Sequence, residues 1–362
     1  MDLEKVKPKP FENAALSPEN IRLNDYRPVS IFNIPQTDVR RASFPVIDMH
    51  THAWQLQLDV SQWVSRMDAA NIEKSVVLTF ETGAGFDAVV QQYAKYADRF
   101  DLWCGFDYTG YDQGDDSWTD HAVAELERCY RMGAKGVGEL GDKGVGEFYS
   151  RPVAGYGLHL DDPRMKPLFR KCGELKMPVN IHIADPMWMY LPMDAQNDGL
   201  MNAYEWRIDP AQPGLLDHGA LLQTFENVVR NHPETMFIAC HFANCTYDLN
   251  IVARLLDTYP NLYVDNAARF AETATIPRVA KAFYERYQDR LLFGTDLGYD
   301  LEMNMEYAAK FYQVAFRIME STDDHFYEHG IFTYHWPLYG LGLSPQVLEK
   351  IYRLNALKLL QQ

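Results

Sequence analysis

Two histidines stand two residues apart, His50 and His52, in the short apolar stretch VIDMHTHAW. In a β-strand, side chains alternate between the two faces, so this spacing places both imidazoles on one face together with Asp48. Met49 and Thr51 would share the other face. Two imidazoles on one face can bind the same metal ion, whereas a single histidine is more often a hydrogen-bonded residue of the core. The spacing therefore indicates a candidate metal site.

Three further metal-binding side chains follow other apolar runs: His182 in VNIHIADP, His241 in FIACHFAN and Asp296 in LLFGTD. Taken singly, each has an ordinary structural explanation, because buried imidazoles can bond to the backbone and Asp296 could be the N-cap of the next helix. Chance rarely places all three, with the two histidines above, at the ends of predicted strands. Neutral imidazoles and a carboxylate suit Zn²⁺, and a site with an open coordination position keeps a bound water.

Short β-branched apolar runs alternate with segments of helical period from Phe44 onward. This alternation is typical of βαβ units and a parallel sheet, and hence of an α/β protein. The span from residue 46 to residue 296 matches the roughly 250 residues of a closed (β/α)₈ TIM barrel, whose active sites lie at the carboxyl ends of the strands. An open doubly wound sheet of eight strands fits less well. The predicted strands are Val46–His52, Ser75–Phe80, Leu102–Asp107, Ala134–Leu140, Val179–Ile183, Met236–Phe242, Leu262–Ala267 and Leu291–Asp296.

Other segments surround this barrel. Residues 1–45 contain six prolines and little periodicity, so we expect an extended N-terminal arm that packs on the barrel or on a neighbouring subunit. Residues 46–362 are expected to form the barrel and a C-terminal helical extension. Long insertions at Gly141–Asp162 and Ala184–His218 follow strand ends, where loops build active sites. Three histidines of a C-terminal aromatic segment are expected to serve packing or oligomer contacts rather than metal binding: His325, His329 and His335.

The ordered set of H-x-H on strand one, histidines on strands five and six and an aspartate on strand eight resembles the amidohydrolase superfamily of metal-dependent TIM barrels. The nearer likeness is to the amidohydrolase-related branch that includes the aminocarboxymuconate-semialdehyde and aromatic-acid decarboxylases. The stretches that carry it are FPVIDMHTH, PVNIHIADP, FIACHFAN, YPNLYVDNAAR, DRLLFGTD and LEKIYRLNALKLL. The resemblance implies that His50, His52 and His182 are metal ligands and that Asp296 is both ligand and proton acceptor. It implies that His241 completes a second metal site or polarises the substrate.

The fourth predicted strand bears on the number of metal ions. It reads AKGVGELGDKG, and alternation places Lys135, Val137 and Glu139 on one face. Binuclear members of the superfamily bridge two ions at this strand with a carbamylated lysine or a glutamate, and GVGELG is similar to the strand-four glutamate of TatD-type hydrolases. Glu139 is therefore either a bridging ligand or a residue that orients the substrate or a histidine. The resemblance implies one Zn²⁺, or two if Glu139 bridges.

Several residues near the predicted strand ends are placed to contact a substrate. Asp185 and Asn244 could orient the histidines or the substrate. Arg269 follows strand seven, where a guanidinium is a natural clamp for a carboxylate, although a surface salt bridge would explain it equally well. Trp54 and Trp188 could form an aromatic lid over the substrate or a contact between subunits.

Five cysteines are spread among apolar runs, a pattern typical of buried thiols rather than of a disulfide framework. We therefore expect a reducing compartment, the cytoplasm, unless an export signal has been removed. Cys240 directly precedes His241. Because adjacent strand residues point to opposite faces, we expect Cys240 to pack against the outer helices.

The net charge argues against two classes of binding partner. The net charge of −16 and pI near 5.1 disfavour nucleic acid and anionic membranes, because both carry negative charge. No apolar stretch approaches the roughly 18 residues that a membrane span needs. We expect a small-molecule substrate and a homo-oligomer.

Three functions fit these residues. The first is a metal-dependent hydrolase in which a metal-activated water attacks an amide, ester or lactone carbonyl, with Asp296 and His241 as catalytic residues. The second is a non-oxidative, metal-dependent decarboxylase of an aromatic or enol acid, with Arg269 holding the carboxylate. The third is a binding protein that has kept its metal site, against which the complete set of ligands speaks.

Overall fold

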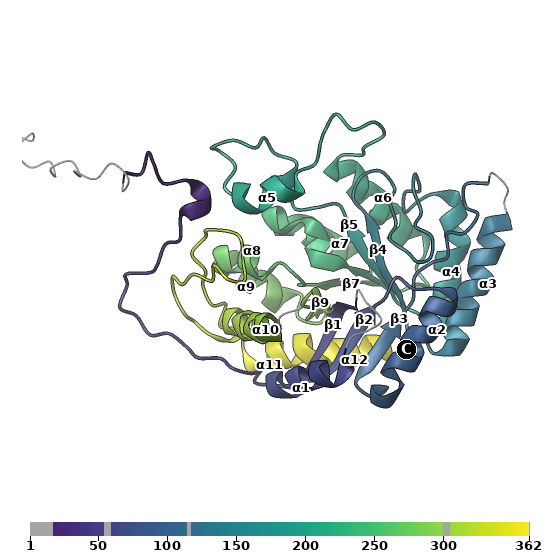
Figure 1. The fold of residues 1–362 in the computed structure, drawn as a ribbon, viewed down its shortest axis with the longest axis horizontal. Coiled ribbons are helices and arrows are strands. Elements are labelled where there is room, and N and C mark those ends of the chain that lie inside the picture. Colours follow the sequence, from purple (N-terminus) through teal and green to yellow (C-terminus); the bar gives the residue numbers. More distant parts are fainter. Residues whose placement is uncertain (1–16, 54–58, 114–116, 300–304, 362) are drawn as a thin grey trace, which may run out of the picture.

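A computed structural model of the chain describes residues 17–53, 59–113, 117–299 and 305–361 (Figure 1). All the paired strands are parallel, and helices alternate with them along the chain. The α/β prediction is therefore confirmed. The strands of the described residues are β1 (Val46–Ala53), β2 (Ile72–Leu78), β3 (Phe100–Trp103), β4 (Val137–Asp142), β5 (Val179–Ile183), β6 (Phe237–Ala239), β7 (Leu262–Asp265), β8 (Leu291–Leu292) and β9 (Leu297–Tyr299).

The strands follow their sequence order around a (β/α)₈ barrel. Regular pairing gives one sheet of order β3-β2-β1-β9 and a second of order β4-β5-β6-β7-β8. Backbone hydrogen bonds join the two sheets on both sides: the Cys104 N–H donates to the Gly136 carbonyl at 3.1 Å, and the Met49 N–H donates to the Phe293 carbonyl at 2.9 Å. The predicted barrel is confirmed. Each of the two places where the sheets meet is held by a few backbone hydrogen bonds rather than by a long run of paired strand residues.

Several predicted strands are longer than the observed ones, and the sixth and the eighth differ most. The sixth ends at Ala239 rather than at Phe242, because the chain turns left-handed from His241 onward. The eighth ends at Leu292, and the chain then pairs again as β9 with residues 51–53 of β1. Both differences fall at the carboxyl ends of strands, where the candidate ligands lie.

Helices cover the outside of the strands, and within the described residues none is long and apolar enough to cross a membrane. Their apolar faces are buried against the barrel, as with Val252, Leu255 and Leu256 of the seventh helix. The helices are α1 (Val60–Ala70), α2 (Gly83–Tyr93), α3 (Ser117–Met132), α4 (Lys166–Leu175), α5 (Leu200–Trp206), α6 (His218–Asn231), α7 (Leu249–Thr258), α8 (Phe270–Thr275), α9 (Pro277–Arg286), α10 (Met305–Glu320), α11 (Pro345–Glu349) and α12 (Asn355–Leu360).

The lower half of the barrel interior is apolar and filled. Ala356 and Leu359 of α12 close it from the amino-terminal side, where Figure 1 shows the C-terminal helices beneath β1. The strand side chains of this apolar cluster are Ile47, Met49, Val76, Leu78, Trp103, Ile238, Tyr263 and Leu292.

The described part of the N-terminal arm runs along the C-terminal segment of the same chain (Figure 1). The His335 Nε2 accepts a hydrogen bond from Arg27 at 3.1 Å, and the His329 Nε2 donates to the Pro28 carbonyl at 2.7 Å. His325 lies 3.2 Å from the Ser30 hydroxyl. These three histidines therefore hold the arm, in line with the packing role predicted for them.

Asp323 attaches the N-terminal arm at a second point, at Thr37. Its carboxylate accepts bonds from the Thr37 N–H at 2.8 Å, the Thr37 hydroxyl at 2.6 Å and the Arg317 guanidinium at 2.8 Å. Burial alone would raise the pKa of Asp323, but the bonds from Thr37 and Arg317 outweigh burial and lower it. A lowered pKa means that this carboxylate stabilises the fold at neutral pH and loses that effect as the pH falls through the folded-state pKa.

We expect Asp323→Asn to lower the free energy of unfolding at pH 7 by about 1.5–3 kcal/mol, the usual size of a charged hydrogen bond. The difference from wild type should shrink as the pH falls from about 4, the ordinary pKa of an aspartate in the unfolded chain, through the lowered pKa of Asp323 in the folded protein. Urea unfolding at several pH values measures both effects. Asp38→Asn is the control, because the ion pair of Asp38 with Arg40 is exposed. Equal effects of the two substitutions would contradict this attachment of the arm.

Candidate metal centre

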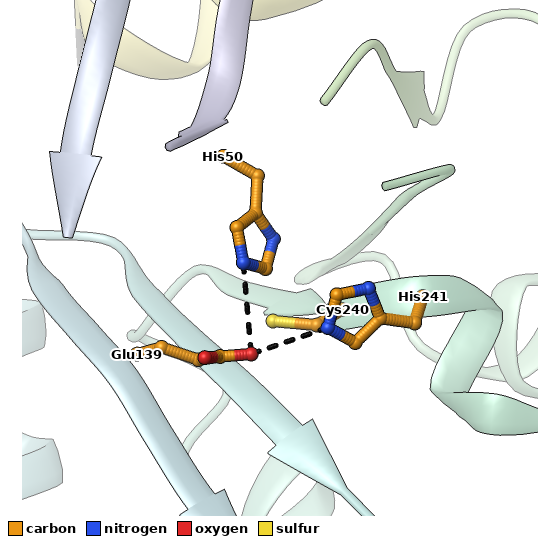
Figure 2. Close-up of side chains that lie close together, drawn as sticks. All are labelled: His50, Glu139, Cys240 and His241. Atoms are coloured by element: carbon orange, nitrogen blue, oxygen red, sulfur yellow. Dashed lines mark hydrogen bonds and ion pairs between the residues drawn. The ribbon is translucent and has the colours of Figure 1, made fainter. Parts of the chain in front are cut away.

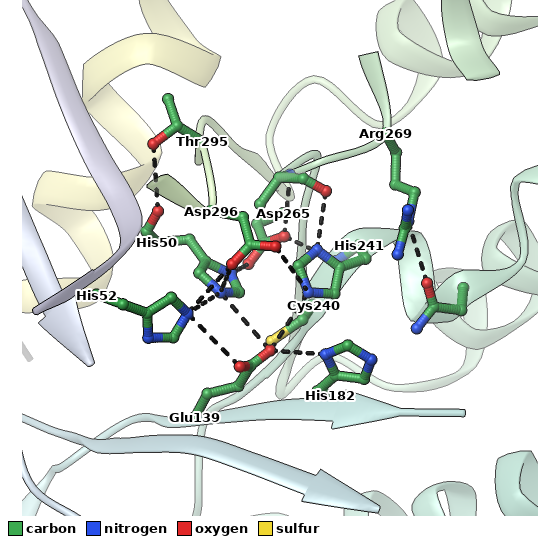
Figure 3. Close-up of polar contacts among 12 residues, drawn as sticks. His50, His52, Glu139, His182, Cys240, His241, Asp265, Arg269, Thr295 and Asp296 are labelled. Carbon is green, nitrogen blue, oxygen red and sulfur yellow. Dashed lines mark hydrogen bonds and ion pairs between the residues drawn. The ribbon is translucent and has the colours of Figure 1, made fainter. Parts of the chain in front are cut away.

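Four imidazoles and two carboxylates converge at the carboxyl end of the barrel (Figure 3). Five strands supply them, which places residues far apart in the sequence around one point. His50 and His52 come from β1, Glu139 from β4, His182 from β5, His241 from the turn after β6 (η7, Cys240–Asn244) and Asp296 from the chain after β8. All the predicted metal ligands thus lie together.

A second hydrogen bond fixes the ring orientation of three of these histidines. The Nδ1 of His50 lies 2.9 Å from the Asp265 carboxylate. The Nδ1 of His52 lies 3.1 Å from the Leu78 carbonyl, and that of His241 lies 2.8 Å from the Ala267 carbonyl. Because each acceptor draws a proton to Nδ1, the lone pair of each Nε2 is left free. Histidines that ligate metals in proteins are held in this way.

The Glu139 carboxylate lies among all four imidazoles. Its Oε1 is 2.9 Å from the Nδ1 of His182, 3.3 Å from the Nε2 of His241 and 3.6 Å from the Nε2 of His50. Its Oε2 is 3.6 Å from the Nε2 of His52. The two oxygens therefore face different histidines.

Asp296 lies on the open side of the group. Its Oδ1 is 3.2 Å from the Nε2 of His52 and 3.4 Å from the Nε2 of His50, and its Oδ2 is 4.0 Å from the Nε2 of His241. The side chain keeps 32% of its surface exposed, far more than Glu139 at 11%. Of the two candidate carboxylate ligands, Asp296 is the more exposed to solvent.

Electrostatics keeps both carboxylates charged. Burial alone would raise the pKa of Glu139, but the imidazoles of His182, His241 and His50 outweigh it and hold this pKa well below its usual range. Burial alone would also raise the pKa of Asp296, but hydrogen bonds from His50 and His52 outweigh burial and hold this pKa well below its usual range. Burial lowers the pKa of His241, so this imidazole is neutral and can offer a lone pair. Burial alone would lower the pKa of His50 and of His182, but the carboxylates beside them, chiefly Asp265 for His50 and Glu139 for His182, outweigh it and raise both values. Two ionised carboxylates among imidazoles that give up their protons to a bound cation form a donor set that suits a divalent ion.

The donor atoms are also close enough to share an ion. His50, His52 and Asp296 form one group whose ligand atoms all lie within 4.8 Å of one another. His50, Glu139, Cys240 and His241 form a second group by the same measure. The residues present therefore fit the metal centre that the sequence predicted.

Strict alternation fails on two of the strands that carry these residues, β1 and β4. On β1, the register shifts between Asp48 and Thr51, so Asp48 bonds Thr295 and Tyr312 of α10 instead of sharing the face of the histidines. On β4, the register shifts between Val137 and Leu140, so Glu139 faces the centre. Val137 packs instead in the larger apolar core, which includes side chains of the outer helices such as Leu168 of α4. The predicted common faces of Asp48 with His50, and of Val137 with Glu139, were wrong because a bulge breaks the two-residue period.

The expected outward position of Cys240 was also wrong. Ile238 faces the barrel interior, and Cys240 follows it by two residues on the same side. His241 reaches the centre only because the backbone turns left-handed there, with φ of 57°. The Sγ of Cys240 lies 2.6 Å from the Asn180 amide oxygen, inside the barrel.

A cavity of about 530 Å³ opens above the centre. Arg269, Asp185, His182 and Asp296 line it together with Lys143. The Lys143 ammonium lies 3.2 Å from the Asp185 carboxylate, which in turn faces the Nε2 of His182 at 3.6 Å. Two segments form the walls of the cavity: the insertion after β5 (residues 184–218) and residues 305–343, which run from α10 into the aromatic segment. Their lining residues include Met189, Trp206, Tyr307, Phe311, Phe332 and Tyr334.

The structure places the other predicted substrate contacts differently. Asn244 lies behind the cavity wall, where its amide donates to the Ile183 and Ala184 carbonyls and its oxygen accepts from Arg269 at 3.1 Å. Trp188 does not line the cavity, because its indole donates to Asp198 at 2.5 Å and its ring packs on Trp336. Trp54 lies outside the described residues.

Sequence reasoning missed two groups that hold the ligands. Asp265 accepts from the His50 ring and from the His241 N–H at 2.8 Å, and Asn180 lies beneath it at 3.4 Å. Alternation could have found both, because Asp265 shares a face with the inward Tyr263, and Asn180 shares one with His182. Lys143 was missed as well, and its place directly after the fourth strand was the available signal.

The fold and the site define a (β/α)₈ protein whose metal-binding side chains lie at the carboxyl ends of the strands. The model of the family described as amidohydrolase matches residues 47–362, and the chain therefore belongs to the amidohydrolase family. The resemblance found in the sequence is confirmed.

Solved structures agree on the fold. An uncharacterised TIM-barrel protein from Bordetella bronchiseptica is 16% identical with a TM-score of 0.52, over 88% of this chain and 99% of that one. A putative amidohydrolase from Staphylococcus aureus is 14% identical with a TM-score of 0.51, over 88% of this chain and all of the other (100%). No curated protein sequence matches the chain significantly.

We expect Asp265→Asn to weaken Zn²⁺ binding by about 10–100-fold, the usual cost of losing a group that orients a ligand histidine. The substitution keeps the shape but removes the charge that fixes the His50 ring. Competition with a chromophoric chelator measures the affinity. Asp257→Asn is the matched control, because Asp257 pairs with Arg286 at the surface. Unchanged Zn²⁺ affinity in a folded Asp265→Asn protein would refute this role.

Proposed function

We propose that this chain is a metal-dependent hydrolase that cleaves an amide, ester or lactone bond of a small molecule. The observation that carries the proposal is the position of Asp296. Its carboxylate faces His50 and His52 on one side and lines the cavity on the other. A carboxylate so placed can accept a proton from water beside the ligand histidines and pass it to the leaving group.

Zn²⁺, when bound to such donors, lowers the pKa of water to about 7 and polarises carbonyl groups. We assign one ion to His50, His52 and Asp296. His241 is neutral because burial lowers its pKa, so its Nε2 can serve as a ligand or contact the substrate carbonyl. Fixed, dehydrated groups of this kind stabilise charge that develops in the transition state.

Arg269 is the group that we assign to substrate binding. The guanidinium lines the cavity, and its Nε and Nη1 are anchored by Asn244 at 3.1 Å and Glu272 at 3.2 Å. Burial alone would lower the pKa of Arg269, but nearby carboxylates, Glu272 above all, keep it charged. An anchored guanidinium favours a substrate that carries a carboxylate.

The position of Glu139 supports a second ion. Its Oε1 faces His182 and His241 while its Oε2 faces His52, as expected of a carboxylate that bridges two ions. We therefore infer that Glu139 bridges the ion described above and an inner ion near His182 and His241.

The same cavity also suits a second candidate, the decarboxylation of an aromatic or enol acid. The observation that favours it is Arg269, which could hold a carboxylate on the cavity wall that also includes Asp296. The presence of Glu139 favours hydrolysis over decarboxylation, because the decarboxylase-like branch that the sequence resembles usually lacks a ligand on strand four. Carbon dioxide released from hydroxybenzoates by the Zn²⁺-loaded protein would select this candidate instead.

We expect Asp296→Asn to lower kcat by about 10²–10⁴-fold, the range for removing a general acid or base. The assay uses Zn²⁺-loaded protein with a panel of aryl esters, N-acyl amino acids and lactones, and elemental analysis of the same samples follows bound zinc. Asp209→Asn, in the exposed insertion after β5, controls for the loss of a surface charge. If the variant kept its turnover with zinc still bound, Asp296 would not be the group that accepts the proton from water.

We expect wild-type protein to carry two Zn²⁺ per chain and Glu139→Gln to carry one, because glutamine keeps the size of the side chain but not its charge. Elemental analysis after dialysis against a trace of Zn²⁺ gives the ratio. Glu147→Gln, in the insertion after β4, is the control. One ion per chain in both wild type and the Glu139 variant would show that Glu139 orients rather than bridges.

A further inference from the structure

Cys240 lies on the floor of the metal centre. Figure 2 shows its sulfur beside the Glu139 carboxylate and the His241 ring, with His50 opposite. The residue has no exposed surface. Cys240 forms a group with His50, Glu139 and His241 in which one ligand atom of each residue lies within 4.8 Å of the others.

The second layer of contacts holds the sulfur in this position. The thiol donates to the Asn180 amide oxygen at 2.6 Å, and the Asn180 amide nitrogen donates to Asp265 at 3.4 Å. Asp265 also holds His50, so the same group orients a candidate ligand histidine and braces the residue beneath the sulfur. The sulfur is consequently a fixed part of the centre.

The inner ion needs a further donor. Both candidate groups include His50. Its Nδ1 is bonded to Asp265, which leaves the one lone pair of Nε2, so His50 can serve only one ion. With His50 at the outer ion, Glu139 and His241 of the second group remain for the inner one, and His182 lies beside Glu139 at 2.9 Å. Zinc in proteins usually takes four ligands in a tetrahedron, and cysteine sulfur is among those it binds most readily.

The other cysteines have different surroundings. Cys129 contacts Glu125, Cys245 contacts the Ala243 carbonyl, and Cys172 lies on the buried face of α4. Cys104 bonds the Gly136 carbonyl. Cys240 is thus the cysteine of this chain that lies among candidate metal ligands.

We propose that Cys240 supplies a sulfur donor to the inner metal ion, so that this centre prefers soft ions such as Cd²⁺ and Zn²⁺ over Mn²⁺. The proposal rests on the metal centre of the proposed function but not on the reaction catalysed there. On binding, the S–H bond breaks, an S–metal bond forms and the proton leaves to the buffer, with no change of oxidation state. A bound cation deprotonates a coordinating thiol outright.

The test is a titration of metal-free protein with Co²⁺, followed by absorption in the near ultraviolet. A Co–S bond gives an intense charge-transfer band that nitrogen and oxygen donors do not give. We expect this band in wild type and in the Cys172→Ala control, and its loss in Cys240→Ala. Chelator competition should show at least a tenfold loss of Cd²⁺ affinity in Cys240→Ala, since even second-layer losses cost about 10–100-fold, and a smaller loss for Mn²⁺.

Wild-type protein that binds Co²⁺ without the band would overturn the proposal, as would a band that survives in Cys240→Ala. Circular dichroism checks that the variant folds, and Cys240→Ser offers a second, more conservative replacement. The wild-type spectrum decides the question even if both variants misfold. Hydrolysis is assayed separately with Zn²⁺, so turnover without a sulfur band refutes only the sulfur ligand, and a band without turnover refutes only the hydrolase.

Discussion

The position of one buried carboxylate constrains the rest of this molecule. Glu139 lies within 3.6 Å of a nitrogen of each of four histidines, in a site removed from water. A buried charge without partners is costly, and imidazoles compensate it only if each ring is turned correctly. The acceptors that turn the rings lie on other strands, at Leu78 and Asp265 and just after β7 at Ala267. The geometry of the site therefore depends on the register of most of the barrel.

The backbone at the strand exits meets this requirement at an energetic cost. Non-glycine residues adopt left-handed φ values after five strands: Phe80 at 59°, Ala184 at 58°, His241 at 57°, Ala268 at 57° and Asp296 at 67°. Such conformations cost about 1 kcal/mol or more each and persist only where surrounding contacts impose them. Bonds from neighbouring strands do so here: the His241 N–H donates to Asp265 at 2.8 Å and the Asp296 N–H donates to the His50 carbonyl at 2.8 Å.

These exits mark the limit of what the sequence could predict. A two-residue period places residues correctly while a strand stays regular, and so His50, His52 and His182 could be assigned from their neighbours. The period cannot show a bulge or a left-handed turn, because both arise from bonds to other strands. Asp48 was therefore placed inward and Cys240 outward, and both were wrong. Contacts such as those of Trp188 with Trp336 were beyond prediction, because they join segments far apart in the sequence.

The cavity walls are joined by a different kind of contact. Asn202 of α5 bonds the Tyr334 hydroxyl at 2.9 Å and the Thr333 hydroxyl at 2.8 Å, so side chains of irregular segments hold the two walls together. Changes in such walls need not disturb the strands that carry the metal ligands. Tyr334 connects this wall to Arg269, because its hydroxyl donates at 3.2 Å to Glu272, which anchors the Arg269 guanidinium. A change in the wall can thus reach Arg269 through Glu272 while the candidate metal ligands stay in place.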